Sequence, residues 1–295
     1  EKPEDFSSIP SAYLNFYQQT LQDNKLDPQW VAYLLSLPSV MEIAQHMDLI
    51  DPIAIYQARE ALANTLADTC SDAFEAFYQR LQSNDAYKPS NAQIAKRAGK
   101  NFALGMLARS KDPKAIAKAK NQFDHANNLS DRLAAFCAIM HFASEAEQAS
   151  YSEKMLAAWQ DQDLVVNKWL NVMAQSCDHQ GVAQFESLSK HPCYNIKNPN
   201  KVYAVLGGLM QNPLLFHAKD GSGYQLLKQQ LMQLNTINPQ VAAKMLRPMV
   251  RFAKYHEPYQ KNMLALLQDL DKMPDLAKDM KEITQLALST IKQPA

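Results

Sequence analysis

Two pairs of cysteine and histidine carry the residue types that bind zinc. The pairs are Cys177-x-His179 and His191-x-Cys193, and the sequence VAQFESLSK lies between them. Structural zinc sites usually separate the two ligands of a pair by roughly two to four residues. Here the gap is a single residue and the intervening sequence has the character of a helix. The pattern therefore favours buried cysteines and surface histidines over a zinc site.

The other titratable residues lack the partners that catalysis needs. His141 and Glu145 are four residues apart, but no third ligand accompanies them. His256-Glu257 begins like the motif H-E-x-x-H, but Pro258 is expected to open a helix rather than to lie inside one. No serine, cysteine or threonine stands in a nucleophile motif. These residue types predict a helical scaffold with no catalytic, cofactor-binding or metal-binding residues of its own.

A glycine-containing loop, Asp220-Gly221-Ser222-Gly223-Tyr224, is the remaining candidate for ligand binding. The chain has only 7 glycines, and four of them lie between residues 195 and 224. A helix is expected to follow this loop, with Ser222 and Gln225 forming a capping box. A helix start can bind an anion, but neither G-x-G-x-x-G nor G-K-[ST] is present and no strand precedes the loop. We therefore interpret the loop as a structural turn.

Helices must position all of these residues. Apolar residues recur at helical spacing along nearly the whole chain, and alternating β-branched runs are missing. Each of six Asp-Pro or Asn-Pro pairs precedes such a segment, as expected for a capping residue followed by proline at the first helical position. The pairs begin at Asp27, Asp51, Asp112, Asn198, Asn212 and Asn238.

This pattern predicts an all-α fold of about fifteen short antiparallel helices, stacked in an irregular α-solenoid. No convincing boundary divides the chain, so we expect a single domain over residues 1–295. Ser144 and Glu147 should form a capping box, Ser130 should cap the helix after residue 128, and the last helix should span about residues 275–291. The helix after Asp27-Pro28 is expected to turn three side chains inward, those of Trp30, Leu34 and Leu37.

The composition excludes several classes of partner. Lysine plus arginine equals aspartate plus glutamate at 30 each, so no global basic field favours nucleic acid. The basic and aromatic run at residues 251–261 is better explained as a solvated helix end than as a docking site for an acidic partner. No apolar run of about 18 residues is present, so no membrane span is expected.

The cysteines and the first residues indicate the origin of the chain. The four cysteines form no C-x-x-C pair and no disulfide framework, which predicts a reducing, cytoplasmic location. The chain begins EKPEDFSSIP, without an initiator methionine or a signal-peptide pattern. We therefore expect it to be a piece of a longer protein.

Seven segments of the chain carry a family resemblance: IDPIAIYQAREALANTLA (50–67), IAKRAGKN (94–101), FDHANNLSDRLAAF (123–136), LVVNKW (164–169), NPNKVYAVLGG (198–208), FHAKDGSGY (216–224) and NPQVAAKM (238–245). They resemble the C-terminal helical domain of bacterial aminopeptidase N, the alanyl aminopeptidases of the zinc gluzincin family. The similarity reaches almost to the C-terminus, while residues 1–48 match only loosely.

The resemblance implies a function for a longer parent enzyme. That enzyme would remove N-terminal amino acids from peptides, with zinc held upstream by H-E-x-x-H and a distant glutamate, and with a G-x-M-E-N segment for the substrate amine. None of these motifs occurs here. The chain would be a non-catalytic, bowl-shaped final domain that caps the active site and lines the peptide channel. Its partners would be the upstream catalytic domain and short peptides, with no nucleic acid and no membrane.

The resemblance also points to individual residues. Lys244 matches the basic position of the family segment N-P-Q-V-A-x-[RK], which is thought to face the peptide chamber. Relatives often have arginine there, so lysine would supply a point charge rather than a bidentate grip. Tyr203, in NPNKVY, aligns with a position that can be basic, and Asp220 and Ser222 are the further channel candidates. The alternative is an independent α-solenoid that binds a protein or peptide, and an upstream H-E-x-x-H in a longer reading frame would separate the two.

Overall fold

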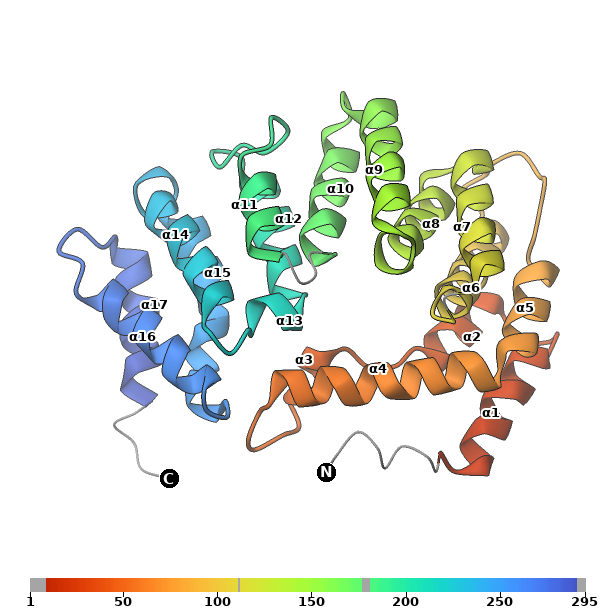
Figure 1. Cartoon of the computed structure of the whole chain (residues 1–295), viewed down its shortest axis with the longest axis horizontal. Helices are drawn as coiled ribbons and strands as arrows, with labels where there is room; N and C mark the ends of the chain where they lie inside the picture. Colours follow the sequence, from red (N-terminus) through yellow and green to blue (C-terminus); the bar gives the residue numbers. More distant parts are fainter. Residues whose placement is uncertain (1–8, 111, 177–180, 291–295) are drawn as a thin grey trace. The chain divides into compact units, whose positions relative to one another are not determined.

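Helices account for the whole regular secondary structure of the described residues. The computed structural model describes residues 9–110, 112–176 and 181–290, which form seventeen α-helices and one 3₁₀-helix and contain no strand longer than an isolated bridge (Figure 1). The all-α prediction is therefore confirmed. No helix in these residues is long and apolar enough to cross a membrane.

Aspartate or asparagine before proline begins six of the helices, as predicted. In each case the side-chain oxygen accepts a hydrogen bond from a backbone N–H of the first turn, and proline occupies the first helical position. The bond from Lys114 N to Asp112 Oδ1, for example, is 2.8 Å long. The six helices are α2 (Pro28–Leu35), α4 (Pro52–Thr69), α7 (Pro113–His125), α12 (Pro199–Met210), α13 (Pro213–Phe216) and α15 (Pro239–Leu246).

The chain divides into two compact units. Unit 1 comprises residues 1–40 and 56–157. Its central helix, α6 (Asn91–Ala108), packs against α2, α5 (Ser71–Arg80), α7 and α8 (Leu129–Phe142), and Phe74, Leu104 and Phe136 are fully buried among them. Helix α1 (Ser11–Gln22) packs on α5, most of α4 belongs to this unit, and most of α9 (Glu145–Trp159) follows α8.

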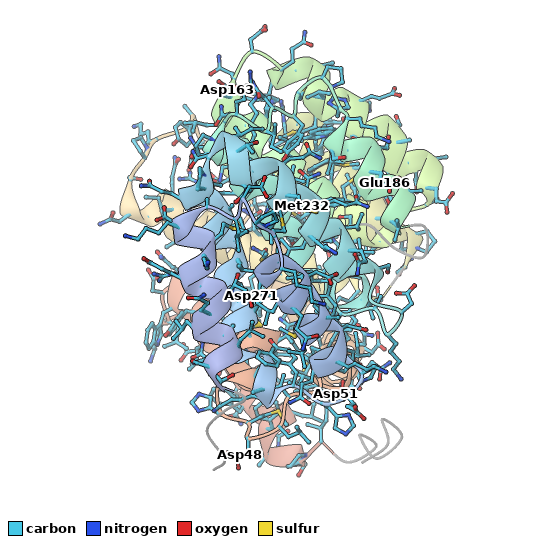
Figure 2. All side chains as sticks on the ribbon, turned by 90° about the vertical axis from the view of Figure 1, so that its left-hand side faces the viewer. Asp48, Asp51, Asp163, Glu186, Met232 and Asp271 are labelled. Carbon is cyan, nitrogen blue, oxygen red and sulfur yellow. The ribbon has the colours of Figure 1, made fainter. Side chains whose placement is uncertain are left out.

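Unit 2 comprises residues 41–55 and 158–295. Its packed pairs include α10 (Asp163–Gln175) with α12, α11 (Gly181–Ser189) with α14 (Ser222–Ile237), and α17 (Lys278–Ser289) with both α15 and α16 (Tyr259–Asp271). Figure 2 shows the side chains of this unit in front, with Met232 of α14 and Asp271 at the end of α16 labelled. The expectation of a single domain over residues 1–295 stays a prediction.

A short backbone bridge joins residues 41–55 to the rest of unit 2. Most of helix α3 (Val40–Ala44) lies in this segment, before the bridge. The other partner of the bridge directly follows the 3₁₀-helix η2 (Arg247–Lys254). Ile50 N donates to Lys254 O at 2.7 Å, and His256 N donates to Ile50 O at 2.8 Å. Because Ile50 is buried, this bridge fixes the residues that lead into α4.

The predicted inward face of α2 is wrong by one position. Trp30 is 53% exposed and Leu34 is 41% exposed, and Val31 and Leu35 are buried instead, while Leu37 is half-buried. Tight packing on α6 explains the difference, because a β-carbon at Gly99 of α6 would lie only 2.9 Å from Pro28 Cβ. The face of α2 that continues from this contact is the one with Val31 and Leu35.

The predicted helix boundaries are corrected at two points and confirmed at a third. Asn128, not Ser130, caps α8, and its Oδ1 accepts from Asp131 N at 2.9 Å. Asparagine therefore takes the role that the sequence analysis gave to serine, two residues earlier. The Ser144 box is confirmed in one direction, because Glu147 Oε2 accepts from Ser144 N at 3.1 Å. Helix α17 is shorter than predicted, since it begins at Lys278 and ends at Ser289.

Candidate functional site

The structure brings together two of the four predicted channel residues. Lys244 Nζ lies 4.3 Å from the ring centroid of Tyr203. Lys244 is exposed and Tyr203 is half-buried, so the ammonium group covers the ring face while remaining open to solvent. An exposed cation–π contact of this kind contributes about 0.5–1 kcal/mol.

Two helices of unit 2 create this contact. Tyr203 lies on α12 and Lys244 lies near the end of α15, and the two helices pack against each other. Val202 and Val205 of α12 and Ala242 of α15 are fully buried. Because these apolar residues fix the helix pair, they place the two polar side chains side by side on the outer surface.

The arrangement at Lys244 is chemically suited to holding an anion. An ammonium group has three donors, and the ring of Tyr203 contacts it without accepting a conventional hydrogen bond. Those donors therefore stay available for a carboxylate or carbonyl oxygen. Contact with the ring also reduces the freedom of the flexible lysine side chain, which lowers the entropy that a ligand contact must overcome.

Asp220 and Ser222 form a separate local turn. Asp220 Oδ1 accepts from Ser222 N at 2.9 Å, and this bond lowers the pKa of Asp220. Between them Gly221 has a φ of +78°, in the left-handed region that favours glycine. Asn262 of α16 braces the turn, because its Nδ2 donates to Lys219 O at 3.1 Å. The interpretation of this loop as a structural turn agrees with these contacts.

The predicted capping box at Ser222 is wrong. Gly221 occupies the cap position of α14 and Ser222 is already the first helical residue, with no side-chain cap on the helix. Asp220 bonds the Ser222 N–H instead, and the backbone of Gly221 accepts from Gln225 N at 3.1 Å. The helix therefore begins one residue earlier than predicted, and the aspartate rather than the serine closes the turn before it.

A buried histidine cluster lies directly beside this turn, and the sequence analysis missed it. His217 is 4% exposed, and its Nδ1 lies 2.7 Å from the Tyr224 hydroxyl oxygen. Its ring stacks on Tyr255 with the centroids 5.5 Å apart. The available signal was the segment FHAKDGSGY, in which an aromatic, a histidine and a tyrosine flank the glycine turn.

Burial controls the charge of this cluster. Removal from water lowers the pKa of His217 to about 3, because the charged imidazolium is poorly solvated there, and Asp51 partly opposes the shift. Burial together with a hydrogen bond to Asp51 raises the pKa of Tyr259 to about 12. Asp51, labelled in Figure 2, thus contacts the cluster from the start of α4. His217 is neutral at physiological pH and serves packing.

A second buried polar network joins two of the resembling segments in unit 1. Lys100 Nζ and Asp131 Oδ2 are 2.7 Å apart, and both side chains are nearly buried. Asn101 Nδ2 donates to Asp131 Oδ1 at 2.9 Å, and Gln122 Nε2 donates to Asp131 O at 2.9 Å. These bonds join residues 94–101 to residues 123–136, and the sequence analysis did not foresee this contact.

The histidines considered as metal ligands form local contacts. Cys177 and His179 lie outside the described residues. His191 Nδ1 accepts from Cys193 N at 3.1 Å, and its ring centroid lies 5.0 Å from that of Trp169. Burial lowers the pKa of His191. Within the described ranges, no group of three or more histidine, cysteine, aspartate or glutamate residues could hold a metal ion.

Comparison with known families assigns the chain. The family model described as a domain of unknown function (DUF3458_C) with ARM repeats matches residues 3–289. The chain belongs to the DUF3458_C family. ARM repeats are stacked helical units, so the family description agrees with the helical array of the structure.

Curated relatives of this DUF3458_C chain are much longer proteins. It is 35% identical over 286 residues to aminopeptidase N of Escherichia coli, and the match covers 96% of this chain and 32% of that protein. It is 31% identical over 282 residues to aminopeptidase N of Haemophilus influenzae, covering 94% and 31%. The chain thus spans about a third of these relatives, and the resemblance to the C-terminal domain of aminopeptidase N is confirmed.

A solved structure shows the same fold. Aminopeptidase A of Legionella pneumophila, crystallised in complex with aspartic acid, superposes with a TM-score of 0.86 at 24% identity. The match covers 96% of this chain and 34% of that one. The helical arrangement of the DUF3458_C chain therefore occurs in a larger protein.

Proposed function

We propose that this chain is the non-catalytic C-terminal domain of a zinc-dependent aminopeptidase that removes N-terminal amino acids from peptides. The observation that carries the proposal is that nearly the whole chain is similar to about one third of the length of proteins named aminopeptidase N. In this proposal the domain caps the active-site chamber as a helical bowl and lines the peptide channel. The alternative of an independent scaffold has less support, because the curated relatives that match nearly the whole chain are larger proteins with a peptidase name.

The zinc and the catalytic groups belong to the upstream domain in this proposal. Zinc there would supply Lewis-acid chemistry for amide hydrolysis. Two of the described histidines are engaged elsewhere, since His217 is packed with tyrosines and His191 accepts from a backbone N–H. The proposed contribution of this chain is to bind the part of the peptide that does not react.

Lys244 and Tyr203 are the proposed contact with that part of the peptide. The exposed ammonium group can bind a peptide carboxylate or carbonyl oxygen, and the tyrosine ring holds it in place. A contact far from the scissile bond acts through binding, so it changes KM or kcat/KM according to whether it persists in the transition state.

The proposed partners and location follow the same reasoning. The partners are the upstream catalytic domain and short peptides, and equal numbers of acidic and basic residues disfavour nucleic acid. We propose a cytoplasmic location. Cys70 and Cys193 are free thiols, as in proteins from a reducing compartment.

Substitution of Lys244 tests this function. In a full-length enzyme carrying this domain, Lys244→Ala should lower kcat/KM for tri- and tetrapeptides by about 3- to 30-fold, since a partly solvated charged hydrogen bond contributes roughly 1–2 kcal/mol. An aminoacyl anilide has no further amino acid after the scissile bond that could reach Lys244. Its kcat/KM should therefore be the same in the variant and in the unchanged enzyme. Lys281→Ala, at an exposed position of α17, is the matched control.

The role of the ring can be separated from that of the charge. Tyr203→Phe keeps the cation–π contact and should leave peptide cleavage unchanged, whereas Tyr203→Leu should reproduce part of the Lys244→Ala loss. Equal losses on anilide and peptide would indicate misfolding. Unchanged cleavage of every peptide by Lys244→Ala would show that this residue does not face the peptide.

A further inference from the structure

Unit 1 contains an open cavity that the proposed function does not use. Its volume is about 410 Å³, and it lies among residues 35–37 and helices α4, α6 and α8. Small-molecule sites in proteins have volumes of roughly 300–1,000 Å³. The cavity is therefore large enough to hold an amino-acid side chain together with its backbone.

Most of the cavity wall consists of small or apolar residues. Ala63, Gly105, Ala134 and Ala138 line it from three helices. A β-carbon added at Gly105 would meet no atom within 4 Å, so the helix surface there is open to the cavity. The apolar walls are completed by Leu35, Leu37, Phe102, Met106 and Phe142.

Two arginines at the cavity share a single carboxylate. Arg109 Nη1 lies 2.7 Å from Glu60 Oε2, and Arg59 Nη1 lies 2.8 Å from Glu60 Oε1. Two guanidinium groups against one carboxylate leave one positive charge in excess. The described residues that line the cavity include no aspartate or glutamate, so nothing in the lining offsets this charge.

Further contacts hold both guanidinium groups in place beside the cavity. Arg59 Nε donates to Pro38 O at 2.8 Å, and the guanidinium of Arg109 lies 5.7 Å from the ring centroid of Phe142. Both arginine side chains are largely buried, at 25% and 15% exposed. Fixed, partly dehydrated guanidinium groups bind carboxylates more strongly than flexible surface lysines do, because less entropy and less hydration are lost.

We propose that this cavity binds the C-terminal residue of a peptide whose last side chain is apolar. The side chain would occupy the space around Gly105, and the terminal carboxylate would bind Arg59 and Arg109. An apolar ligand alone would leave the excess charge unpaired, and a small anion alone would leave the apolar space unfilled. The ligand that matches both features has a carboxylate attached to an apolar group.

Binding measurements on the intact 295-residue chain test the proposal. The probes are the peptide Ala-Ala-Phe, its C-terminal amide, and Ala-Ala-Asp, followed by calorimetric or NMR titration. We expect Ala-Ala-Phe to bind with Kd on the order of 1 mM or tighter, and both other peptides to bind at least about tenfold more weakly. Equal binding of the acid and the amide would overturn the proposal.

Two substitutions locate the binding site. Gly105→Leu fills the cavity from a position with open space and should abolish binding, while Gly105→Ala should retain it. Arg59→Gln should weaken binding of the acid to the level of the amide. Far-UV circular dichroism and thermal unfolding verify that each variant is folded. Unchanged binding by folded Gly105→Leu would exclude this cavity.

The cavity site and the peptide contact proposed at Lys244 are tested separately. Lys281→Ala, at an exposed position outside both the cavity and the contact proposed at Lys244, should bind Ala-Ala-Phe as the unchanged chain does. Loss of binding in Lys244→Ala, with retention in Gly105→Leu, would place the peptide at Lys244 and contradict the proposed cavity site. The two experiments can therefore fail separately.

Discussion

His217 shows how a residue of a recognisable segment can have a structural role. It lies between Phe216 and the glycine turn, it contacts the hydroxyl of Tyr224, and it is buried. A histidine held in the neutral form by burial links folding to pH, because the unfolded chain can bind a proton that the folded chain does not.

The direction of this linkage is determined by the lowered pKa. The pKa of His217 is about 3 in the folded chain and near 6.5 in the unfolded chain. Below pH 6.5 the unfolded state takes up a proton and the folded state does not, until the pH approaches 3. The contribution of neutral His217 to the free energy of unfolding is therefore fully present above pH 6.5. It is lost as the pH falls from 6.5 towards 3, by about 1.4 kcal/mol per pH unit.

Unfolding in urea at pH 7.5 and pH 5.5 measures this effect. We expect His217 to account for a loss of about 1.4 kcal/mol in the free energy of unfolding between these two pH values. The variant His217→Gln should be less stable at pH 7.5 but should lack this part of the pH dependence. His125→Gln, at an exposed position, is the control and should keep the dependence. Identical pH slopes for His217→Gln and the unchanged chain would contradict the assignment.

The candidate site was only partly predictable at the residue scale. Lys244 and Tyr203 were named from resemblance to a family, but their contact depends on how α12 packs against α15. No local pattern encodes that packing. The burial of His217 was missed for the same reason, since Tyr255 and Tyr259 reach it from a distant part of the sequence.

At the scale of the element, local chemistry predicted the starts of the six helices that follow Asp-Pro or Asn-Pro pairs. Asp-Pro and Asn-Pro pairs work because both residues act within one turn, so neighbouring helices hardly affect them. The inward face of α2 failed because it depends on contact with Gly99 of α6. The predicted caps at Ser130 and Ser222 failed because Asn128 and Asp220 lie nearby and form the competing bonds.

Glycine substitutions distinguish close helix packing from helix flexibility. A β-carbon at Gly223 would lie 2.2 Å from Leu215 O and 2.5 Å from Phe216 O, so the backbone of α13 must move to accept it. We expect Gly223→Ala to lower the free energy of unfolding by about 1–3 kcal/mol, as in other overpacked sites.

Gly105→Ala is the matched control for this prediction. It adds the same methyl group inside α6 but into open space, so it should stabilise the chain by about 0.5–1 kcal/mol through reduced backbone freedom. Urea unfolding of both variants provides the comparison. A neutral Gly223→Ala would show that α13 and α14 are not as closely packed as described.

At the scale of the whole molecule, each unit has its own buried core and its own polar network. Unit 1 contains the Lys100–Asp131 pair, and unit 2 contains the His217 cluster. The periodicity of the sequence predicted the helices of both units, but it gave no sign of the division between them. Residues 41–55 explain this, because they belong with residues that follow position 157 rather than with their sequence neighbours.

If zinc binding and catalysis belong to an upstream domain, as proposed, this chain alone should show neither property. Five of the six described histidines have side chains that pack against aromatic rings or contact backbone atoms, as those of His217 and His141 do. The purified chain should therefore hydrolyse no aminoacyl anilide and should retain no stoichiometric zinc after treatment with a chelator. Metal analysis by mass spectrometry and an anilide assay at high protein concentration measure these two properties.

The matched comparison for this experiment is the zinc-loaded parent enzyme, in which the same assay must detect activity. One zinc per chain in the isolated domain would contradict the prediction and would direct attention to Cys177, His179, His191 and Cys193, whose spacing is the nearest approach to a zinc site in this sequence. Double replacement of His191 and Cys193 by alanine would then decide the matter, because it removes half of that ligand set. Anilide hydrolysis that persists in the double variant would place a catalytic centre elsewhere in the chain and would overturn the assignment of catalysis to an upstream domain.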